Sequence, residues 1–259
     1  VPAWSAVSIG QLSLFAVFGL CGFLWCLNQA KPKCAGLMLV FALAKPHPFY
    51  LLLLFILLVL FRPPLRRILG AACLYCAALY SLTFLFLPQS FFAWNSSANL
   101  PLHWKTATLA TQFRILLASQ DGAAPAWPVL AFPLAGIILF CLWYAARKAP
   151  ALSLRTIIPV LCFSLLTAPY AWVFDYSALL IAQVALIAAS SAQSARAAAA
   201  RELACWLLLL QAGLLLMSHL SGSMHVEVWF PLAMLAIWLR GASLLARDNQ
   251  AAFSTSINA

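Results

Sequence analysis

Long runs of apolar residues fill almost the whole chain, and short polar or basic turns separate them. A helix needs about 20 apolar residues to cross the hydrocarbon core of a bilayer. By that criterion the sequence predicts membrane-spanning helices over residues 10–28, 66–87, 128–146, 154–172, 175–195, 203–221 and 226–246. The pattern therefore predicts an all-α protein, a polytopic transmembrane helical bundle of about nine helices in one membrane domain over residues 1–259.

The apolar stretch 34–61 is too long for one span and too short for two. The segment Lys45-Pro46-His47-Pro48 interrupts it. Each proline removes a backbone donor and disfavours helix at the residue before it. We therefore predict a short broken hairpin, two half-length helices that meet at a kinked tip. Because broken helices persist in membranes only where protein or a water-filled cavity covers the freed backbone, we expect the tip to line a cavity near the outer face.

The basic residues support this hairpin. If both its ends lie on one side, the cytoplasmic face carries Lys31, Lys33, Arg62, Arg66, Arg67, Arg147, Lys148, Arg155, Arg196, Arg201, Arg240 and Arg247. Only Lys45, Lys105 and Arg114 then face out. A single straight span would instead place Lys31–Lys33 opposite Arg62–Arg67 and remove most of the asymmetry. The positive-inside rule therefore favours the hairpin.

Composition leads to the same class of protein. Hydrophobic residues make up 65% of the chain and charged residues 8%, whereas soluble domains carry about 25% charged residues. So few charges could not cover a water-facing surface, which excludes a soluble globular domain. The net charge of +10 comes from the basic turns and does not indicate a nucleic-acid partner.

Two segments lie outside this series of spans. The connection 88–127 is predicted to be an exoplasmic loop with a short amphipathic helix, whose apolar side carries Leu109, Phe113 and Leu117 and suits the membrane surface. The polar tail 247–259 is predicted to be cytoplasmic and frayed.

Ionisable residues at membrane depth are candidates for function. Asp175 lies in a tight apolar link between two spans at the outer face, and two interpretations of it stay open. It either pairs structurally with Lys45 or Arg114, or it serves a ligand. Lys45 likewise either extends to the outer interface or binds an anionic head group, and the two prolines that flank His47 favour a ligand slightly.

The sequence contains no pattern that predicts a metal site or a cofactor. Its four histidines are scattered without metal-ligand spacing. Cys73 and Cys76 have CxxC spacing but lie inside an apolar run with no second pair, so we interpret them as small apolar residues. A phosphate-binding glycine loop, HExxH and GxSxG are all missing from the sequence.

An ordered set of motifs resembles a known family. Gly10-Gln11 opens the first span, Ala35-Gly36-Leu37 and then Ala44–Pro48 follow, and a long leucine run ends in Arg62–Arg67. A loop that contains tryptophan comes next, and then Ala168-Pro169-Tyr170-Ala171-Trp172-Val173-Phe174-Asp175. From Gly10 to Leu180 the chain resembles the membrane glycosyltransferases of family 87 in the GT-C superfamily, which include polyprenol-phosphate-mannose-dependent mannosyltransferases.

The resemblance implies a reaction and its partners. A sugar, mannose or another hexose or pentose, moves with inversion from a polyprenyl-phosphate donor to a glycolipid or glycan acceptor on the exoplasmic side. It implies a multi-pass protein of the bacterial inner membrane with its site facing the periplasm or exterior, surrounded by membrane lipids and without a nucleic-acid partner. No cofactor is required, and one carboxylate takes the acceptor proton.

The resemblance also implies site residues. It places the general-base Asp in a first exoplasmic loop before Val1, so we expect the chain as given to lack this base and to be inactive alone; Asp175 is a possible catalytic residue. The expected substrate-binding residues are Gln11, Lys45, His47, Trp94, His103, Arg114, Tyr170, Asp175 and Tyr176.

A polytopic transporter or flippase for a lipid-linked or anionic substrate is the alternative. Broken helices and buried ionisable groups also mark transporters, but those proteins often contain two similar halves, and this sequence shows no clear internal repeat. A non-catalytic membrane scaffold is a third interpretation, in which the outer polar residues have no function.

Overall fold

The computed structural model describes residues 12–89, 105–118, 124–148, 150–191, 197–221 and 224–257. These residues form helices and no strand. The α-helices are α2 (Ser13–Asn28), α3 (Pro32–Ala42), α4 (Tyr50–Leu60), α5 (Arg66–Phe86), α7 (Leu109–Leu116), α8 (Pro128–Ala146), α9 (Leu154–Thr167), α10 (Leu180–Ser191), α11 (Ala197–Ser221) and α12 (Trp229–Ile257). Short 3-10 helices are η1 (His47–Phe49), η2 (Pro63–Leu65), η3 (Val173–Leu179) and η5 (Met224–Val228). The prediction of an all-α bundle is confirmed.

Within the described ranges, four helical segments are long and apolar enough to cross a membrane: Pro63–Phe86, Pro128–Ala146, Ala198–Met217 and Val226–Ser243. Many of their apolar side chains are exposed on the surface, which would be unfavourable in water. Leu74 on α5 is 68% exposed, Leu130 on α8 is 66% exposed and Leu208 on α11 is 69% exposed. Extensive apolar surface of this kind is matched to lipid, and the chain is therefore a membrane protein.

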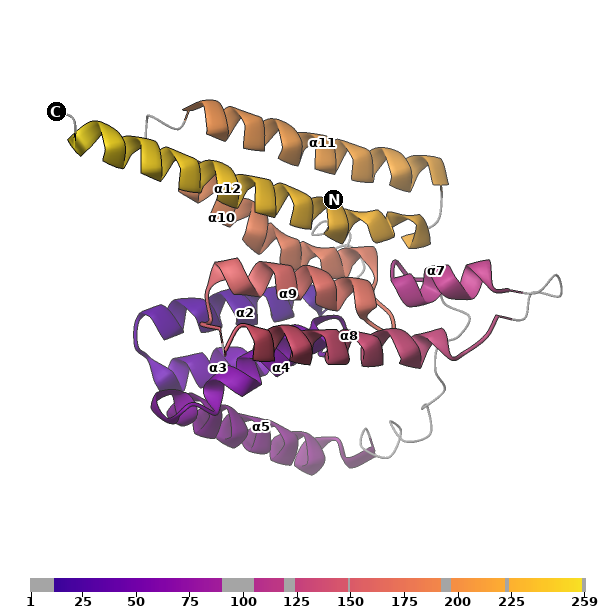
Figure 1. Ribbon diagram of the computed structural model, residues 1–259. Helices are drawn as coiled ribbons and strands as arrows, with labels where there is room; N and C mark the ends of the chain where they lie inside the picture. Colours follow the sequence, from indigo (N-terminus) through magenta and orange to yellow (C-terminus); the bar gives the residue numbers. More distant parts are fainter. Residues whose placement is uncertain are drawn as a thin grey trace.

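The long helices run side by side, and the connections between them fall at two ends of the bundle (Figure 1). The α2–α3, α4–α5 and α8–α9 connections lie at the left end of that view, whereas α7 and the start of α12 lie at the right. Both ends of the broken pair α3–α4 are therefore at the same end of the bundle. This is the arrangement that the hairpin prediction required.

Several helix ends differ from the prediction. The helix predicted at 154–172 stops at Thr167, because Pro169 favours an extended backbone at Ala168, whose φ and ψ are −55° and 147°. The next span begins as η3, a 3-10 helix, and not as an α-helix. At the C-terminal end α12 continues to Ile257, beyond the end of the span predicted at residue 246.

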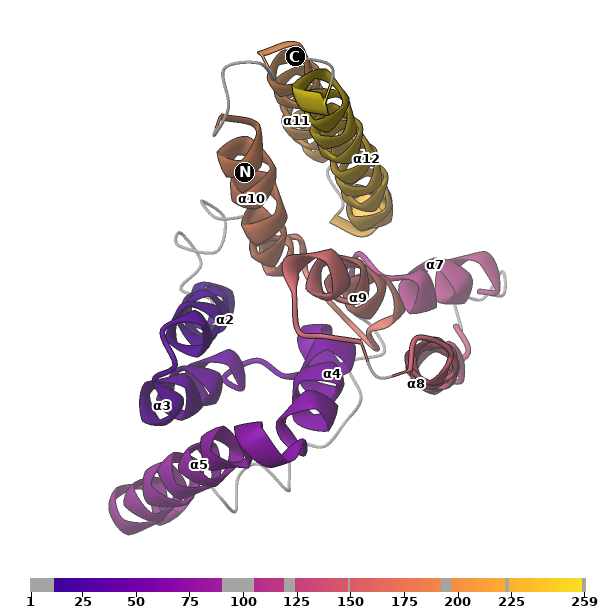
Figure 2. The same ribbon diagram turned by 60° about the vertical axis from the view of Figure 1, so that its left-hand side comes forward.

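The centre of the bundle consists of α4 and α9, with α2, α3 and α5 on one side and α10, α11 and α12 on the other (Figure 2). Leu51 and Phe55 of α4 and Ile157 and Leu161 of α9 are fully buried. Small residues allow neighbouring helices such as α3 and α5 to pack closely, as is typical in membranes. A Cβ atom on Gly36 of α3 would lie 2.8 Å from the backbone nitrogen of Ala72 on α5.

Candidate functional site

The broken pair α3–α4 turns sharply at its prolines. The axes of its two halves, Pro32–Ala42 and His47–Leu60, are bent by 115°. A bend larger than 90° turns the second half back along the axis of the first. The prediction of two half-length helices meeting at a kinked tip is confirmed.

A side chain of α9 satisfies backbone groups that the break frees. The Ser164 hydroxyl donates to the carbonyl oxygen of Pro48 at 3.0 Å and accepts from the Leu51 N–H at 3.1 Å. All three residues are buried. In a membrane each such group would cost several kcal/mol if it were left unpaired, so Ser164 makes the first turn of α4 possible.

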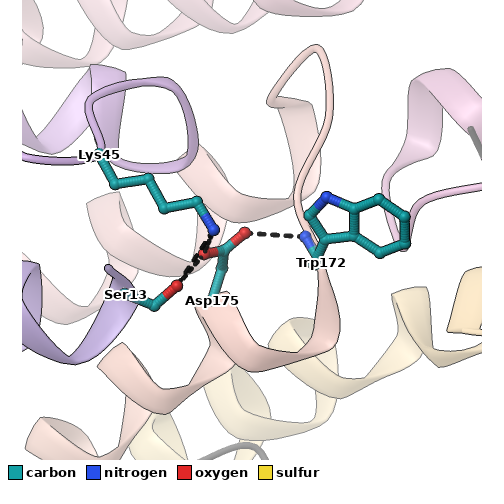
Figure 3. Close-up of polar contacts among 4 residues, drawn as sticks. All are labelled: Ser13, Lys45, Trp172 and Asp175. Carbon is teal, nitrogen blue, oxygen red and sulfur yellow. Dashed lines mark hydrogen bonds and ion pairs between the residues drawn. The ribbon is translucent and has the colours of Figure 1, made fainter. Parts of the chain in front are cut away.

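Lys45, just before the prolines, forms an ion pair with Asp175. Its Nζ lies 2.5 Å from Asp175 Oδ1, with Lys45 9% exposed and Asp175 fully buried. The Ser13 hydroxyl donates to the same carboxylate oxygen at 2.6 Å and accepts from Lys45 Nζ at 3.1 Å. Figure 3 shows that these three side chains approach from three separate segments: the start of α2, the tip and η3. The cluster therefore ties the tip to the segment 168–176, which joins α9 to η3.

The second oxygen of Asp175 is also engaged. Its Oδ2 accepts from the backbone N–H of Trp172 at 2.8 Å (Figure 3), while the Asp175 N–H donates to the carbonyl of Trp172, also at 2.8 Å. These two bonds close the turn that starts η3. Both carboxylate oxygens thus have hydrogen-bond donors, and the arrangement holds the side chain toward Lys45. Of the two partners that the sequence left open for Asp175, the structure pairs it with Lys45 and not with Arg114.

His47 and Tyr170, both half-buried, pack against each other at the tip. Their rings stack with centroids 4.1 Å apart and an angle of 31° between the planes. The Nε2 atom of His47 is buried and makes no hydrogen bond to any described residue. Burial, and then the charge of Asp175, raise the pKa of the Tyr170 phenol above its ordinary value.

The segment before α7 is docked on the same 168–176 segment. The Ala107 N–H donates to the carbonyl of Ala171 at 3.0 Å, and the Ala107 carbonyl accepts from the Tyr176 hydroxyl at 2.6 Å. The Tyr176 ring stacks on Phe230 of α12, with centroids 5.5 Å apart. Tyr176 is therefore a buried link between the 168–176 segment, the residues before α7, and α12.

The amphipathic helix predicted in the long loop exists as α7. Its Ala110, Thr111 and Arg114 face the protein, whereas Phe113 is 43% exposed. Buried Arg114 donates through Nε to the carbonyl of Pro125, 3.1 Å away. Arg114 therefore joins α7 to the entry of α8.

The structure thus gathers some of the predicted residues and separates others. Lys45, His47, Tyr170 and Asp175 come together, and Tyr176 lies next to them in η3. Gln11, Trp94 and His103 lie outside the described residues. The sequence analysis missed Ser13 and Ser164, and each could have been noticed as a hydroxyl within an otherwise apolar helix. Among the described residues, no three His, Cys, Asp or Glu side chains are grouped so that they could hold a metal ion.

Fold and site together define a helical membrane protein with a buried cation–carboxylate pair at a helix break. The sequence model of glycosyltransferase family 87 matches residues 1–169 of the 259. The chain therefore belongs to glycosyltransferase family 87, and it is a membrane glycosyltransferase. The matched region includes Ser13, Lys45 and His47, and Asp175 lies just beyond its end. Neither the comparison with curated proteins nor that with solved structures gave a match.

Proposed function

We propose that the protein transfers a sugar, mannose or a related hexose or pentose, from a polyprenyl-phosphate donor to a glycolipid or glycan acceptor. Transfer occurs with inversion, in a single membrane domain, at a site facing the periplasm or exterior of a bacterial inner membrane. The observation that carries the proposal is the Lys45–Asp175–Ser13 cluster, a polar group built at a helix break from three distant segments. Polar clusters at membrane depth are rare unless they have a function.

Lys45 is the proposed ligand of the donor phosphate. As the bond between the sugar and the phosphate breaks, negative charge grows on the leaving phosphate, and a cation that is already in place stabilises that charge. Asp175 and Ser13 supply this preorganisation, because they fix the ammonium group before the donor arrives. Asp175 is the counter-ion of Lys45 when the donor is absent.

His47 and Tyr170 are the proposed contacts of the sugar. The buried Nε2 of His47 has no hydrogen-bond partner among the described residues, so a substrate hydroxyl can take that position. The Tyr170 phenol is a second group of the same stacked pair and offers both a donor and an acceptor. Gln11, Trp94, His103 and Arg114 remain proposed contacts of the donor, and Tyr176 is proposed to position α7.

Inversion requires a carboxylate that takes the proton of the acceptor hydroxyl. Asp175 is poorly suited to this step, because both of its oxygens already accept hydrogen bonds within the cluster. We therefore propose Asp175 as a positioning residue for Lys45, with a different carboxylate as general base. The family assignment supports an enzyme over a transporter, although a broken helix occurs in both classes.

The test uses the full-length protein in proteoliposomes with a short-chain polyprenyl-phosphate sugar as donor. Lys45→Met should lower the transfer rate by about 100-fold or more, the scale lost with one electrostatic contact to the transition state. Lys33→Met, which removes an exposed cation of α3, is the matched control and should keep the wild-type rate.

Since Lys45→Met leaves Asp175 buried without its cation, the neutral pair Lys45→Met/Asp175→Leu is measured as well. A folded double variant without activity supports the proposal. A double variant with the wild-type rate would rule out Lys45 as a phosphate ligand. Transfer from a nucleotide sugar but not from the polyprenyl-phosphate sugar would refute the donor class.

A further inference from the structure

A groove runs between α11 and α12, away from the site described above. Its volume is about 610 Å³, within the range of ligand-binding clefts. On α12 it is lined by Trp229, Ala233 and Ala236, and on α11 by Trp206 and Leu209. Spacings of three and four residues place each set on one helix face. The small side chains of Ala233 and Ala236 leave space for the groove, and the larger side chains form its apolar walls.

One end of the groove is charged. There Arg240 of α12 donates through Nε to Glu202 of α11 at 2.9 Å. The two terminal amino groups of the Arg240 guanidinium make no hydrogen bond to any described residue. Exposed Arg201 lies directly before Glu202 on α11. Two cations and one carboxylate therefore give this end of the groove a net positive charge. A guanidinium with unused donors binds phosphate well.

The dimensions of the groove suit a single lipid chain. Trp229 and Arg240 are eleven positions apart on α12, which corresponds to about 16 Å at 1.5 Å per residue. One leaflet of a hydrocarbon core is about 15 Å thick. Glu202 and Arg240 lie near corresponding ends of the candidate spans Ala198–Met217 and Val226–Ser243, and a long arginine side chain there extends its charge to the interface.

From these features we infer that the α11–α12 groove is a binding site for an anionic phospholipid. The phosphate contacts the terminal amino groups of Arg240, and one acyl chain lies along Ala233 and Ala236 toward Trp229. Glu202 holds the guanidinium in place through its Nε. All of α10, α11 and α12 lies beyond the residues that match the family model, so this site belongs to a part of the chain that the match does not cover.

The test measures lipids retained by the purified full chain by native mass spectrometry, with phosphatidylglycerol and phosphatidylcholine supplied in equal amounts. Wild-type protein should retain phosphatidylglycerol in preference. Ala233→Trp fills the groove and should abolish this retention, whereas Leu232→Trp, at an exposed position outside the groove, should not. Arg240→Gln should lower the preference about fivefold, the effect of one cation near an anionic lipid surface, and exposed Arg147→Gln should leave it unchanged.

A second measurement keeps the inference testable if Ala233→Trp does not fold. Wild-type protein is irradiated with phosphatidylglycerol that carries a photoreactive group on its acyl chain, and the labelled peptides are mapped. Labels concentrated on the facing sides of α11 and α12 support the site. Labels spread equally over α5 and α8, equal retention of the two lipids, or full retention by a folded Ala233→Trp variant would overturn it. Sugar transfer is not measured, so the outcome is independent of the proposed function.

Discussion

Lys45 and Asp175, 130 positions apart in the sequence, form an ion pair 2.5 Å long at the break between two half-length helices. Removal of one partner leaves an uncompensated buried charge, which costs about 3–5 kcal/mol of folding stability. Asp175→Leu and Lys45→Met should each destabilise the protein on this scale, and the double variant should lose much less than the sum of the two. Unfolding by titration with a denaturing detergent gives the coupling energy.

The matched control for this cycle is an exposed ion pair between α11 and α12. Arg240 and Glu202 have side chains 49% and 34% exposed, and such pairs contribute about 0–1 kcal/mol. Glu202→Gln should therefore change stability very little. Equal losses at the two pairs would contradict a structural role for the buried one.

Ser164 is predicted to hold the first turn of α4. Its hydroxyl bridges the Pro48 carbonyl and the Leu51 N–H, and Ser164→Ala leaves both groups buried and unpaired. The expected cost is about 1–3 kcal/mol for each unsatisfied group, measured as the free energy of unfolding. Thr83→Ala is the control, since that exposed hydroxyl bonds only to its own helix at Leu79. A Ser164→Ala protein as stable as the control variant would be incompatible with this role.

Substitutions at two glycines distinguish the effect of helix packing on stability from that of helix propensity. A methyl group on Gly36 would lie 2.7 Å from the Ala71 Cβ, whereas a methyl group on Gly70 meets nothing within 4 Å. Gly36→Ala should therefore destabilise the α3–α5 contact by about 1–3 kcal/mol. Gly70→Ala should be neutral or stabilising by about 0.5–1 kcal/mol, because alanine is the better helix former. Similar melting temperatures for the two variants would argue against close packing of α3 on α5.

The hairpin predicts which positions share a membrane side. In a cysteine-free background, single cysteines at Lys33, Arg66 and Arg147 should react together with a membrane-impermeant maleimide, and from the side opposite to a cysteine at Lys105. This follows because both ends of the broken pair lie at one end of the bundle (Figure 1). Labelling of Lys33→Cys and Arg66→Cys from opposite sides would show that the stretch crosses as a single bent span.

Local features of the sequence predicted much of the fold. The apolar runs located every long helix, because a bilayer requires about 20 apolar residues in succession whatever their neighbours are. Pro46 and Pro48 located the break for an equally local reason, since a proline disrupts helix in its own chain. The helix ends were less certain: α9 stops at Thr167 because Pro169 acts one residue ahead of itself, and α12 continues through polar residues that the hydropathy pattern excluded.

The partners across the bundle required the tertiary structure. The sequence marked Lys45 and Asp175 as residues that needed a partner or a ligand, but Arg114 was an equally good partner until packing placed it beside Pro125. Nothing in the apolar segment 10–28 showed that Ser13 would contact Asp175, or that Ser164 would cover the break, because a hydroxyl in a membrane helix can also bond to its own backbone. Hydrophobicity and proline act on neighbouring residues of the same chain, so their effects can be recognised in the sequence. The pairing of buried charges depends instead on how helices pack over separations of more than a hundred residues.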